Sequence, residues 1–147
     1  MSLKQWRENG WLQLHGATKK QIADLIAMVD RDLRVAKATD DADWSFGIAC
    51  NATLKLCTIL LYASGYRASR DLNHYRTLTA LPLILGQGRA GDASYLDQGR
   101  MKRNKLEYEQ TGAVSASEAT ELIEFADVLK TDVLAWLAKE RPELAPT

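Results

Sequence analysis

The chain has 147 residues, of which 46% are hydrophobic and 26% charged, and its 19 basic and 19 acidic residues give a net charge of zero. That size and composition are typical of one soluble globular domain, and zero net charge argues against a surface that coats nucleic acid non-specifically. Two of the three prolines lie in the last six residues, so we expect a single domain over residues 1–142 and a flexible tail over 143–147.

Nearly every segment of the chain has the periodicity of a helix. The first residues, which include Trp6 and Trp11, are expected to form a short helix or an arm. Thr18 and Gln21 then fit a capping box. Apolar residues follow at helical spacing, so the sequence predicts an amphipathic helix that runs to about Ala38.

A second helix is expected from Trp44 to Ser64, with Gly65 as its C-terminal stop. This segment is apolar on nearly all sides. A helix of that kind belongs at the centre of a bundle. Its aromatic residues Trp44, Phe46 and Tyr62 are therefore expected to pack in the core.

The third helix is expected to start at Ser69 as its N-cap, and Pro82 lies inside its pattern, where it produces either a kink or a restart. Three glycines follow within residues 86–91. They lack the preceding strand and the following Gly-Lys-Ser/Thr of a phosphate loop, so a flexible connector is predicted. Asp92 is the expected cap of a fourth helix that runs to about Gln110.

The last helix is expected to open at a second capping box, Ser115 with Glu118, and to end near Arg141. No segment alternates with a period of two, so no sheet is expected. Four main helices with short connections predict an all-α, four- to five-helix antiparallel bundle.

The N-terminal residues and the cysteines indicate a reducing, aqueous location. Met1–Gly10 is polar and lacks the apolar core of a secretory signal. The longest apolar run, Leu54–Ala63, is interrupted by Lys55 and is far shorter than the roughly 20 residues of a membrane span. Cys50 and Cys57 would lie about 10 Å apart along one helix, too far for a disulfide. We expect a cytoplasmic protein with no membrane contact, no metal and no cofactor.

Charge is distributed unevenly along the chain. Residues 67–105 contain eight Lys or Arg and three Asp or Glu, a balance of +5, whereas residues 115–147 contain three and seven, a balance of −4. Two explanations are open. The basic segment forms an anion site beside an acidic face, or the two segments pack together and pair their charges.

The fourth helix carries a polar face at the end of the basic segment. Four residues stand at positions i, i+3, i+4 and i+7 and therefore share one side of the helix: Arg100, Arg103, Asn104 and Glu107. Guanidinium groups suit fork-like binding of phosphate oxygens. The face is therefore either an anion-binding surface in a cleft or at a partner, or a solvated stripe of salt bridges.

The chain has two histidines. His15 lies in the N-terminal arm, where an exposed or hydrogen-bonding role is expected. His74 is one helical turn from Arg70 and next to Tyr75. Neighbouring arginines disfavour the charged imidazole, and a neutral imidazole can act as a general base. A packed or capping role for His74 is the alternative.

At these residues the sequence resembles the HEPN superfamily (higher eukaryote and prokaryote nucleotide-binding domains), which are small all-helical bundles. Many members have an Arg, often followed by Asn, and then a His after four to six residues. Here Arg103 and Asn104 match, and four residues separate Arg103 from Tyr108, which occupies the position of the His. The wider layout is also similar over about residues 3–140, including His74 in the helix before the motif.

The resemblance implies an RNA- or nucleotide-binding domain of toxin–antitoxin or stress-response type, either a metal-independent endoribonuclease or a non-catalytic relative. In active members two copies dimerise and place two Arg and His pairs in a composite cleft. The His promotes attack of the 2′-hydroxyl on the adjacent phosphate, and the Arg stabilises the developing charge. The Tyr at position 108 leaves catalysis open.

Carried onto this chain, the resemblance implies three catalytic positions, Arg103, Asn104 and Tyr108. The candidate substrate-binding residues beside them are Arg100, Glu107 and His74. The expected partners are a second copy of the chain, RNA or a nucleotide, and an antitoxin or nucleotidyltransferase protein. The alternative is a non-catalytic helical module for dimerisation or protein interaction.

Overall fold

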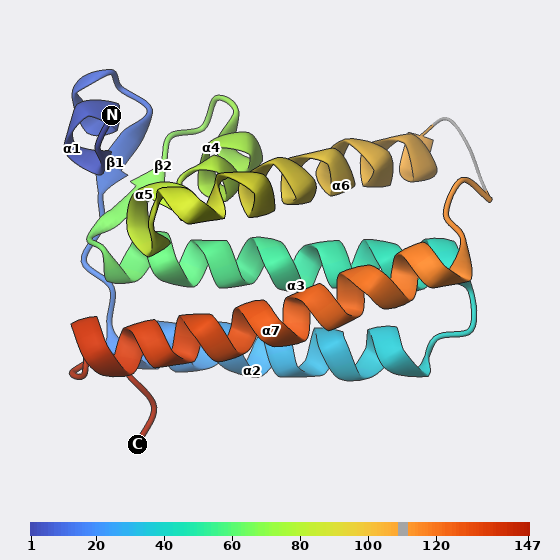
Figure 1. Ribbon diagram of the computed structural model, residues 1–147. Coiled ribbons are helices and arrows are strands. Elements are labelled where there is room, and N and C mark those ends of the chain that lie inside the picture. The colour runs from blue at the N-terminus through green and yellow to red at the C-terminus, as the bar shows by residue number, and fades with distance from the viewer. Residues whose placement is uncertain (109–111) are drawn as a thin grey trace.

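Four long helices form most of the computed structural model, which describes residues 1–108 and 112–147, with side chains for 1–106 and 112–147. They are α2 (Lys19–Ala38), α3 (Ala42–Ala63), α6 (Ala90–Tyr108) and α7 (Ala116–Glu140). Consecutive long helices run in opposite directions, and the short elements gather at one end (Figure 1). The prediction of an all-α helical bundle is confirmed.

Helix α3 lies between two layers, one formed by α6 with α4 (Asn73–Thr79) and the other by α2 with α7 (Figure 1). Lys55 interrupts its apolar surface and pairs with Asp32 of α2, at 2.5 Å between Nζ and Oδ2. Asp32 is only 8% exposed, and its charge is tolerated there because the ammonium compensates it. The pair fixes α2 against α3.

By length and composition α3 is also apolar enough to cross a membrane, with a mean hydropathy of 1.5. However, 56% of that stretch is buried inside the protein. Burial of this kind is what the core helix of a soluble bundle shows. The apolar surface of α3 is therefore used within the fold.

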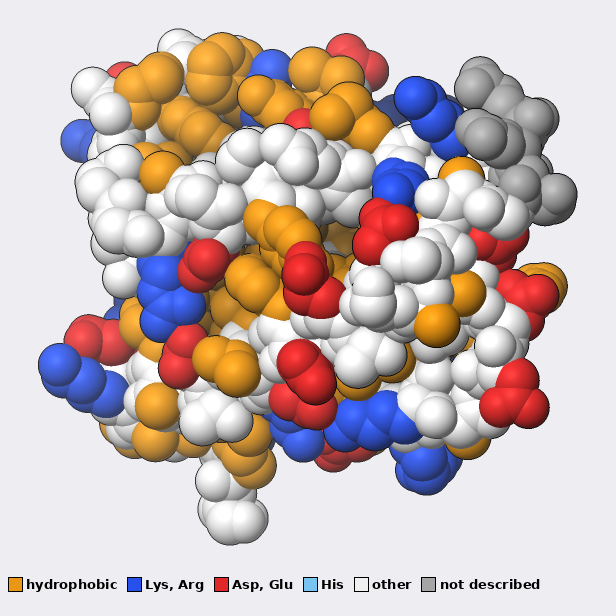
Figure 2. Space-filling view, turned by 45° about the vertical axis from the view of Figure 1, so that its right-hand side comes forward, with side chains coloured by type: hydrophobic (Ala, Val, Ile, Leu, Met, Phe, Trp, Pro, Cys, Tyr) orange, Lys and Arg blue, Asp and Glu red, His pale blue; other side chains and the backbone are white. Residues whose placement is uncertain are grey.

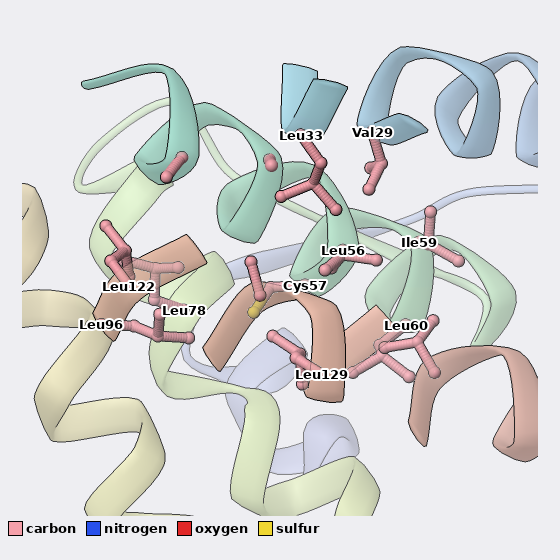
Figure 3. Packing of buried hydrophobic residues seen from close by; sticks show 14 of the residues in the cluster. Val29, Leu33, Leu56, Cys57, Ile59, Leu60, Leu78, Leu96, Leu122 and Leu129 are labelled. Carbon is pink, nitrogen blue, oxygen red and sulfur yellow. The ribbon is translucent and has the colours of Figure 1, made fainter. Parts of the chain in front are cut away.

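The hydrophobic core surrounds α3 and draws on all four long helices and α4. The side chains labelled in Figure 3 belong to it: Val29, Leu33, Leu56, Cys57, Ile59, Leu60, Leu78, Leu96, Leu122 and Leu129. Burial raises the pKa of the Cys57 thiol to about 12, so the thiol stays protonated at neutral pH. Cys50 and Cys57 do not form a disulfide, and Cys50 is half-buried, as expected for small residues of a core helix.

Helices α2 and α7 start at their predicted caps, but only Ser115 and Glu118 form a complete capping box, because the Gln21 side chain bonds His15 instead of the Thr18 backbone. The hydroxyls of Thr18 and Ser115 each accept the backbone N–H three residues on, at 3.1 Å, and these bonds start α2 and α7. Helix α3 begins at Ala42, slightly before its predicted start, because the Asp41 side chain caps it. Gly65 follows the end of α3 with φ +94°, a conformation that glycine adopts at little cost.

A two-stranded antiparallel sheet contradicts the expectation that the chain has no strands. β1 (Leu12–Leu14) pairs with β2 (Tyr66–Ala68), with Leu12 opposite Ala68. Each strand has three residues, too few to show alternation. The strands lie far apart in the chain, so no hairpin turn sequence between them predicts the pairing. The sheet ties the N-terminal segment to the end of α3.

The N-terminal segment forms the short helix that was expected, α1 (Leu3–Glu8). Trp6 is 9% exposed and meets Trp11 edge to face, with ring centroids 5.6 Å apart. The Arg76 guanidinium lies 4.0 Å from the Trp11 ring centroid, a cation–π contact. Both tryptophans are therefore covered by residues of this chain.

The third predicted helix is divided in two, α4 and α5 (Leu81–Leu85). The prediction that Ser69 caps it is wrong. The Ser69 hydroxyl instead donates to the carbonyl of Gly10, at 2.8 Å, and so joins the N-terminal segment to β2. Pro82 lies in the first turn of α5. It therefore restarts the helix, a position that suits its missing N–H.

The glycine-rich segment before α6 is regular instead of a flexible connector. Gln87–Arg89 form a single 3₁₀ turn, and α6 already begins at Ala90. Asp92 therefore lies in the first turn of α6 and does not precede it. Its carboxylate accepts from Arg89 at 3.2 Å, which links the turn to the helix.

The last residues differ from the expected flexible tail over 143–147. Leu144 and Ala145 pack against the core, and Ala145 is only 9% exposed. Arg141 Nε donates to the carbonyl of Ala63 at 3.0 Å. Composition alone predicted that residues 143–147 fray. It does not reveal that the end of α3 lies where these residues can pack.

His15 and two of the three aromatic residues of α3 lie close to their expected places. Phe46 is 5% exposed. Tyr62 is half-buried beneath His15, with ring centroids 4.2 Å apart. His15 Nε2 lies 2.8 Å from Gln21 Oε1, the hydrogen-bonding role expected for this histidine. Trp44, the third aromatic residue, is exposed.

Candidate functional site

One side of α6, together with the turn before it, packs against α7 through paired charges. Arg89 Nη2 lies 2.7 Å from Asp132 Oδ2, and Lys102 pairs with Glu118. On the face seen in Figure 2, basic and acidic side chains lie next to one another and do not form one basic surface. Charge pairing between the basic and the acidic segment therefore accounts for these residues.

Two titratable groups on this side, Glu118 and Tyr95, have shifted pKa values. Lys102 and the N–H of Ser115 lower the pKa of Glu118, so its carboxylate stays ionised. Burial and a hydrogen bond to Glu121 raise the pKa of Tyr95 well above its usual value, so its phenol stays protonated.

The other side of α6 lines a cleft of about 440 Å³ that opens against the first turns of α3. Such a volume is within the range of small-molecule sites, about 300–1,000 Å³. Its lining comes from both helices and from the residues before α3: Asp41, Asp43, Trp44, Gly47, Ile48, Asn51, Arg103 and Leu106.

The side chain of Arg103 lies in the wall of this cleft. α3 and α6 are antiparallel, and their registers place Gly47 beside Arg103 and Cys50 beside Gly99. A Cβ at Gly47 would lie 3.8 Å from Arg103 Nε, so the missing side chain leaves the guanidinium close to the surface of α3. Arg103 is half-buried there and is not a solvated surface residue.

Trp44 overturns the expectation that it packs in the core. It is 70% exposed and lies at the rim of the cleft, in the first turn of α3. Hydrophobic character predicted its burial, but the neighbouring helices do not cover α3 on this side. The sequence carried a signal that was missed: Trp44, Gly47, Ile48 and Asn51 share one helix face, on which a glycine and an amide interrupt an otherwise apolar helix.

Two carboxylates lie at the same end of the cleft as Trp44. Asp41 caps α3 and accepts the Trp44 N–H at 3.0 Å. Asp43 Oδ2 accepts the N–H of Gly112 at 2.7 Å. Asp43 Oδ1 is buried and has no hydrogen-bond partner within the part of the chain that is described. Backbone N–H groups thus hold both acids in place.

A small pocket of about 20 Å³ adjoins the cleft and shares Asn51 and Arg103 with it. His74 and Arg100 are also in its lining. Arg100 Nε donates to Asp97 Oδ1 at 2.8 Å. The structure therefore brings three of the predicted site residues together: Arg100, Arg103 and His74.

The remaining predicted site residues have other outcomes. Asn104 is exposed and is not in the lining of the cleft or the small pocket as described. It follows Arg103 in sequence and therefore points about 100° further round the helix. The side chains of Glu107 and Tyr108 lie outside the described residues, so their roles stay predictions.

The cleft combines an aromatic face, one guanidinium, an amide and two carboxylates. Over residues 1–106 and 112–147 no three His, Cys, Asp or Glu side chains are grouped as metal ligands would be. This arrangement suits a ligand with a flat ring and a single anionic group, because the ring can stack on Trp44 while the anion meets Arg103.

No protein-family model, curated protein or solved structure matches the chain. The chemistry of the cleft therefore carries the functional argument.

Proposed function

We propose that this protein is an RNA- or nucleotide-binding helical domain of HEPN type, and that the cleft between α3 and α6 is its binding site. The observation that carries the proposal is the place of Arg103, half-buried in the wall of a cleft large enough for a nucleotide. A guanidinium there is partly shielded from water. Its bidentate bond to a phosphate is therefore stronger than on an open surface.

Arg100 and His74 support this assignment, because both line the small pocket that shares Arg103 with the cleft. Arg100 is already oriented by its bond to Asp97. Two guanidinium groups and an imidazole thus gather on the side of α6 that faces away from the acidic helix α7. They line the recess between α6 and α3, whereas Arg89 and Lys102 are engaged by carboxylates of α7.

The proposal includes a weak or inactive metal-independent ribonuclease. Arg103 would stabilise the charge on the phosphate while the 2′-hydroxyl attacks phosphorus and the bond to the 5′-oxygen breaks. The 5′-oxygen leaves as a hydroxyl by taking a proton from water, and a 2′,3′-cyclic phosphate remains. A tyrosine at position 108 is a poor base at neutral pH, since its usual pKa is about 10. In this proposal His74 accepts the proton of the 2′-hydroxyl, because it lines the same pocket as Arg103.

The proposal also includes a homodimer in which a second copy presents the same face across from Arg103, and an antitoxin or nucleotidyltransferase as protein partner. Both follow from the HEPN resemblance. Sedimentation equilibrium of the wild-type chain and of Arg103→Glu tests the dimer, because two clefts that face each other would bring the introduced carboxylates together and weaken association.

The binding experiment is RNA affinity as a function of salt. We expect the affinity of a labelled single-stranded RNA to fall steeply as salt rises, since Lys and Arg displace counterions from phosphate. Arg103→Ala should lower the affinity at least about tenfold, the value of one charge-assisted hydrogen bond. Arg7→Ala, which removes an exposed arginine from α1 at the other end of the bundle, is the matched control. An absence of RNA affinity, with a dimer that Arg100→Ala dissociates, would instead identify a protein-interaction module.

The catalytic part has a separate experiment. Any cleavage of RNA should persist in chelator and disappear in Arg103→Ala and His74→Ala. Tyr108→His should increase cleavage, because it restores the residue type of the HEPN motif. Activity that chelator abolishes and a divalent metal restores would rule out the metal-independent mechanism.

A further inference from the structure

We propose that the end of the cleft at Trp44 is a base subsite, in which an unpaired nucleobase stacks on the indole and a base with an exocyclic amino group is preferred to uracil. This inference rests on the proposed function. It adds a residue, Trp44, and a selectivity that Arg103 and its neighbours do not supply.

The first observation is the exposure of Trp44, since the other three tryptophans of the chain are buried or half-buried. Trp6 is buried, and Trp11 lies under Arg76. Trp44, by contrast, leaves 70% of its surface open at the rim of a cleft. A large exposed aromatic ring beside a concave site is a typical feature of a binding surface. Nucleobases are suitable occupants because they stack on tryptophan without a sequence requirement.

The second observation is that charge is arranged along the cleft. Asp41 and Asp43 lie at the end with Trp44, and Arg103 and Asn51 lie toward the small pocket with Arg100. Asn51 is seven residues beyond Trp44, about 10 Å along the axis of α3. A nucleotide therefore has one favourable direction. Its phosphate lies toward the arginines, and its base lies toward the carboxylates and the indole.

The carboxylates give the base subsite its selectivity. An ionised carboxylate only accepts hydrogen bonds. Cytosine and adenine present an amino donor at the position where uracil presents a carbonyl oxygen, which a carboxylate repels. Asp41 and Asp43 each hold a backbone N–H, so neither is free to swing away from an unsuitable base. Net negative charge at this end therefore favours amino-bearing bases.

A paired base cannot use this subsite, because both its faces are stacked and its amino group is engaged within the duplex. RNA recognition that relies on stacking is directed at single strands and loops for this reason. The ligand is consequently an unpaired nucleotide, either free or within a single strand. A mononucleotide and an oligonucleotide of the same base distinguish the two sources.

The experiment compares oligocytidylate and oligouridylate of equal length, with cytidine monophosphate as the free nucleotide. We measure affinity by anisotropy and quenching of tryptophan fluorescence. Trp44→Ala should weaken oligocytidylate binding by at least about fivefold, the lower value for loss of one stacked base. Trp44→Phe should retain most of that affinity but lose the quenching, because it keeps a ring and removes the exposed indole.

Two conservative variants test the selectivity without removing structural bonds. Asp41→Asn remains a good helix cap, and Asp43→Asn keeps an oxygen that can accept the Gly112 N–H. Both should reduce the preference for oligocytidylate over oligouridylate. Leu14→Ala removes another exposed apolar side chain, from β1, and serves as the control for general effects of surface substitution.

The outcomes separate this inference from the function on which it rests. If Arg103→Ala weakens binding while Trp44→Ala does not, the base subsite is wrong and the proposed function stands. If the two oligonucleotides bind wild type equally, or the Asn variants leave the preference unchanged, the selectivity is wrong. If no RNA or nucleotide binds, or Arg103→Ala has no effect on binding, both proposals fail.

Discussion

The two sides of α6 carry similar residues in different settings. Toward α7, Lys102 and the preceding Arg89 are paired with Glu118 and Asp132. Toward α3 and α4, Arg103 and Arg100 line a cleft and an adjoining pocket. The same residue types thus support packing on one side and, in the proposed function, bind an anion on the other. The helices packed on each side of α6 therefore decide which of its basic residues serve packing.

The neighbouring helices explain the difference. The first turns of α7 carry glutamates that reach α6, so basic groups facing them are neutralised. The first turns of α3, by contrast, carry Gly47 and the exposed Trp44. Neither side chain fills the space between α3 and α6, so a cleft remains there. Lys102 and Arg103 are consecutive in α6, but Lys102 faces α7 and Arg103 faces the cleft.

Filling the cleft is the change with the largest expected effect. Gly47→Leu would place a branched side chain where a Cβ alone already lies 3.8 Å from Arg103 Nε, and would displace the guanidinium. We expect RNA affinity to fall at least about tenfold, while the helical fold remains because leucine favours helix more than glycine.

The matched variant is Gly47→Ala. Its Cβ makes only ordinary contact with Arg103, so it should lose far less affinity than the leucine variant and should stabilise α3 by about 0.5–1 kcal/mol. Equal affinities for the leucine variant and wild type would show that RNA binds elsewhere.

A change on the opposite side of α6 should affect stability and not binding. Tyr95→Phe removes the hydrogen bond to Glu121 but keeps the ring that stacks on Phe125, with centroids 4.9 Å apart. The free energy of unfolding should fall by about 0.5–1.5 kcal/mol, measured by urea denaturation. A loss of RNA affinity in this variant would contradict the division of α6 into two sides.

Acid should weaken the α7 side by a smaller amount. The pKa of Glu118 is lowered by Lys102 and by the Ser115 N–H. The carboxylate therefore contributes stability above its usual pKa near 4.5, and this contribution is lost as pH falls through the lowered pKa. We expect wild type to melt above Glu118→Gln at neutral pH and the difference to shrink in acid. Glutamine keeps the capping position, so a difference independent of pH would contradict this pairing.

The sequence predicted most of the fold because its signals are local. Capping residues such as Thr18 and Ser115 start helices through bonds three residues away, and apolar periodicity shows which faces are buried. The paired strands β1 and β2 escaped prediction because each is short and its partner is distant in the chain. The sequence did not predict the packing of Ala145 either, since it also depends on contacts between residues distant in the chain.

The candidate site was predicted only in part. The spacing of Arg100 and Arg103 placed both on one face of α6, and the structure places both beside His74. The same spacing also included Asn104 among the predicted site residues, but Asn104 does not line the cleft. It could not include Trp44, because a tryptophan in an apolar helix predicts burial. Whether an exposed residue meets a cleft depends on which neighbour is missing, and this is set by packing.

The most direct test of the account compares two adjacent substitutions, Arg103→Ala and Lys102→Ala, by RNA affinity and by the free energy of unfolding. We expect Arg103→Ala to lose affinity at least about tenfold. We expect Lys102→Ala to change affinity only slightly and to lower the free energy of unfolding by a small amount, because it loses its surface pair with Glu118. Equal effects of the two substitutions on RNA affinity, or no affinity in wild type, would contradict the claim that Arg103 marks the binding side of α6.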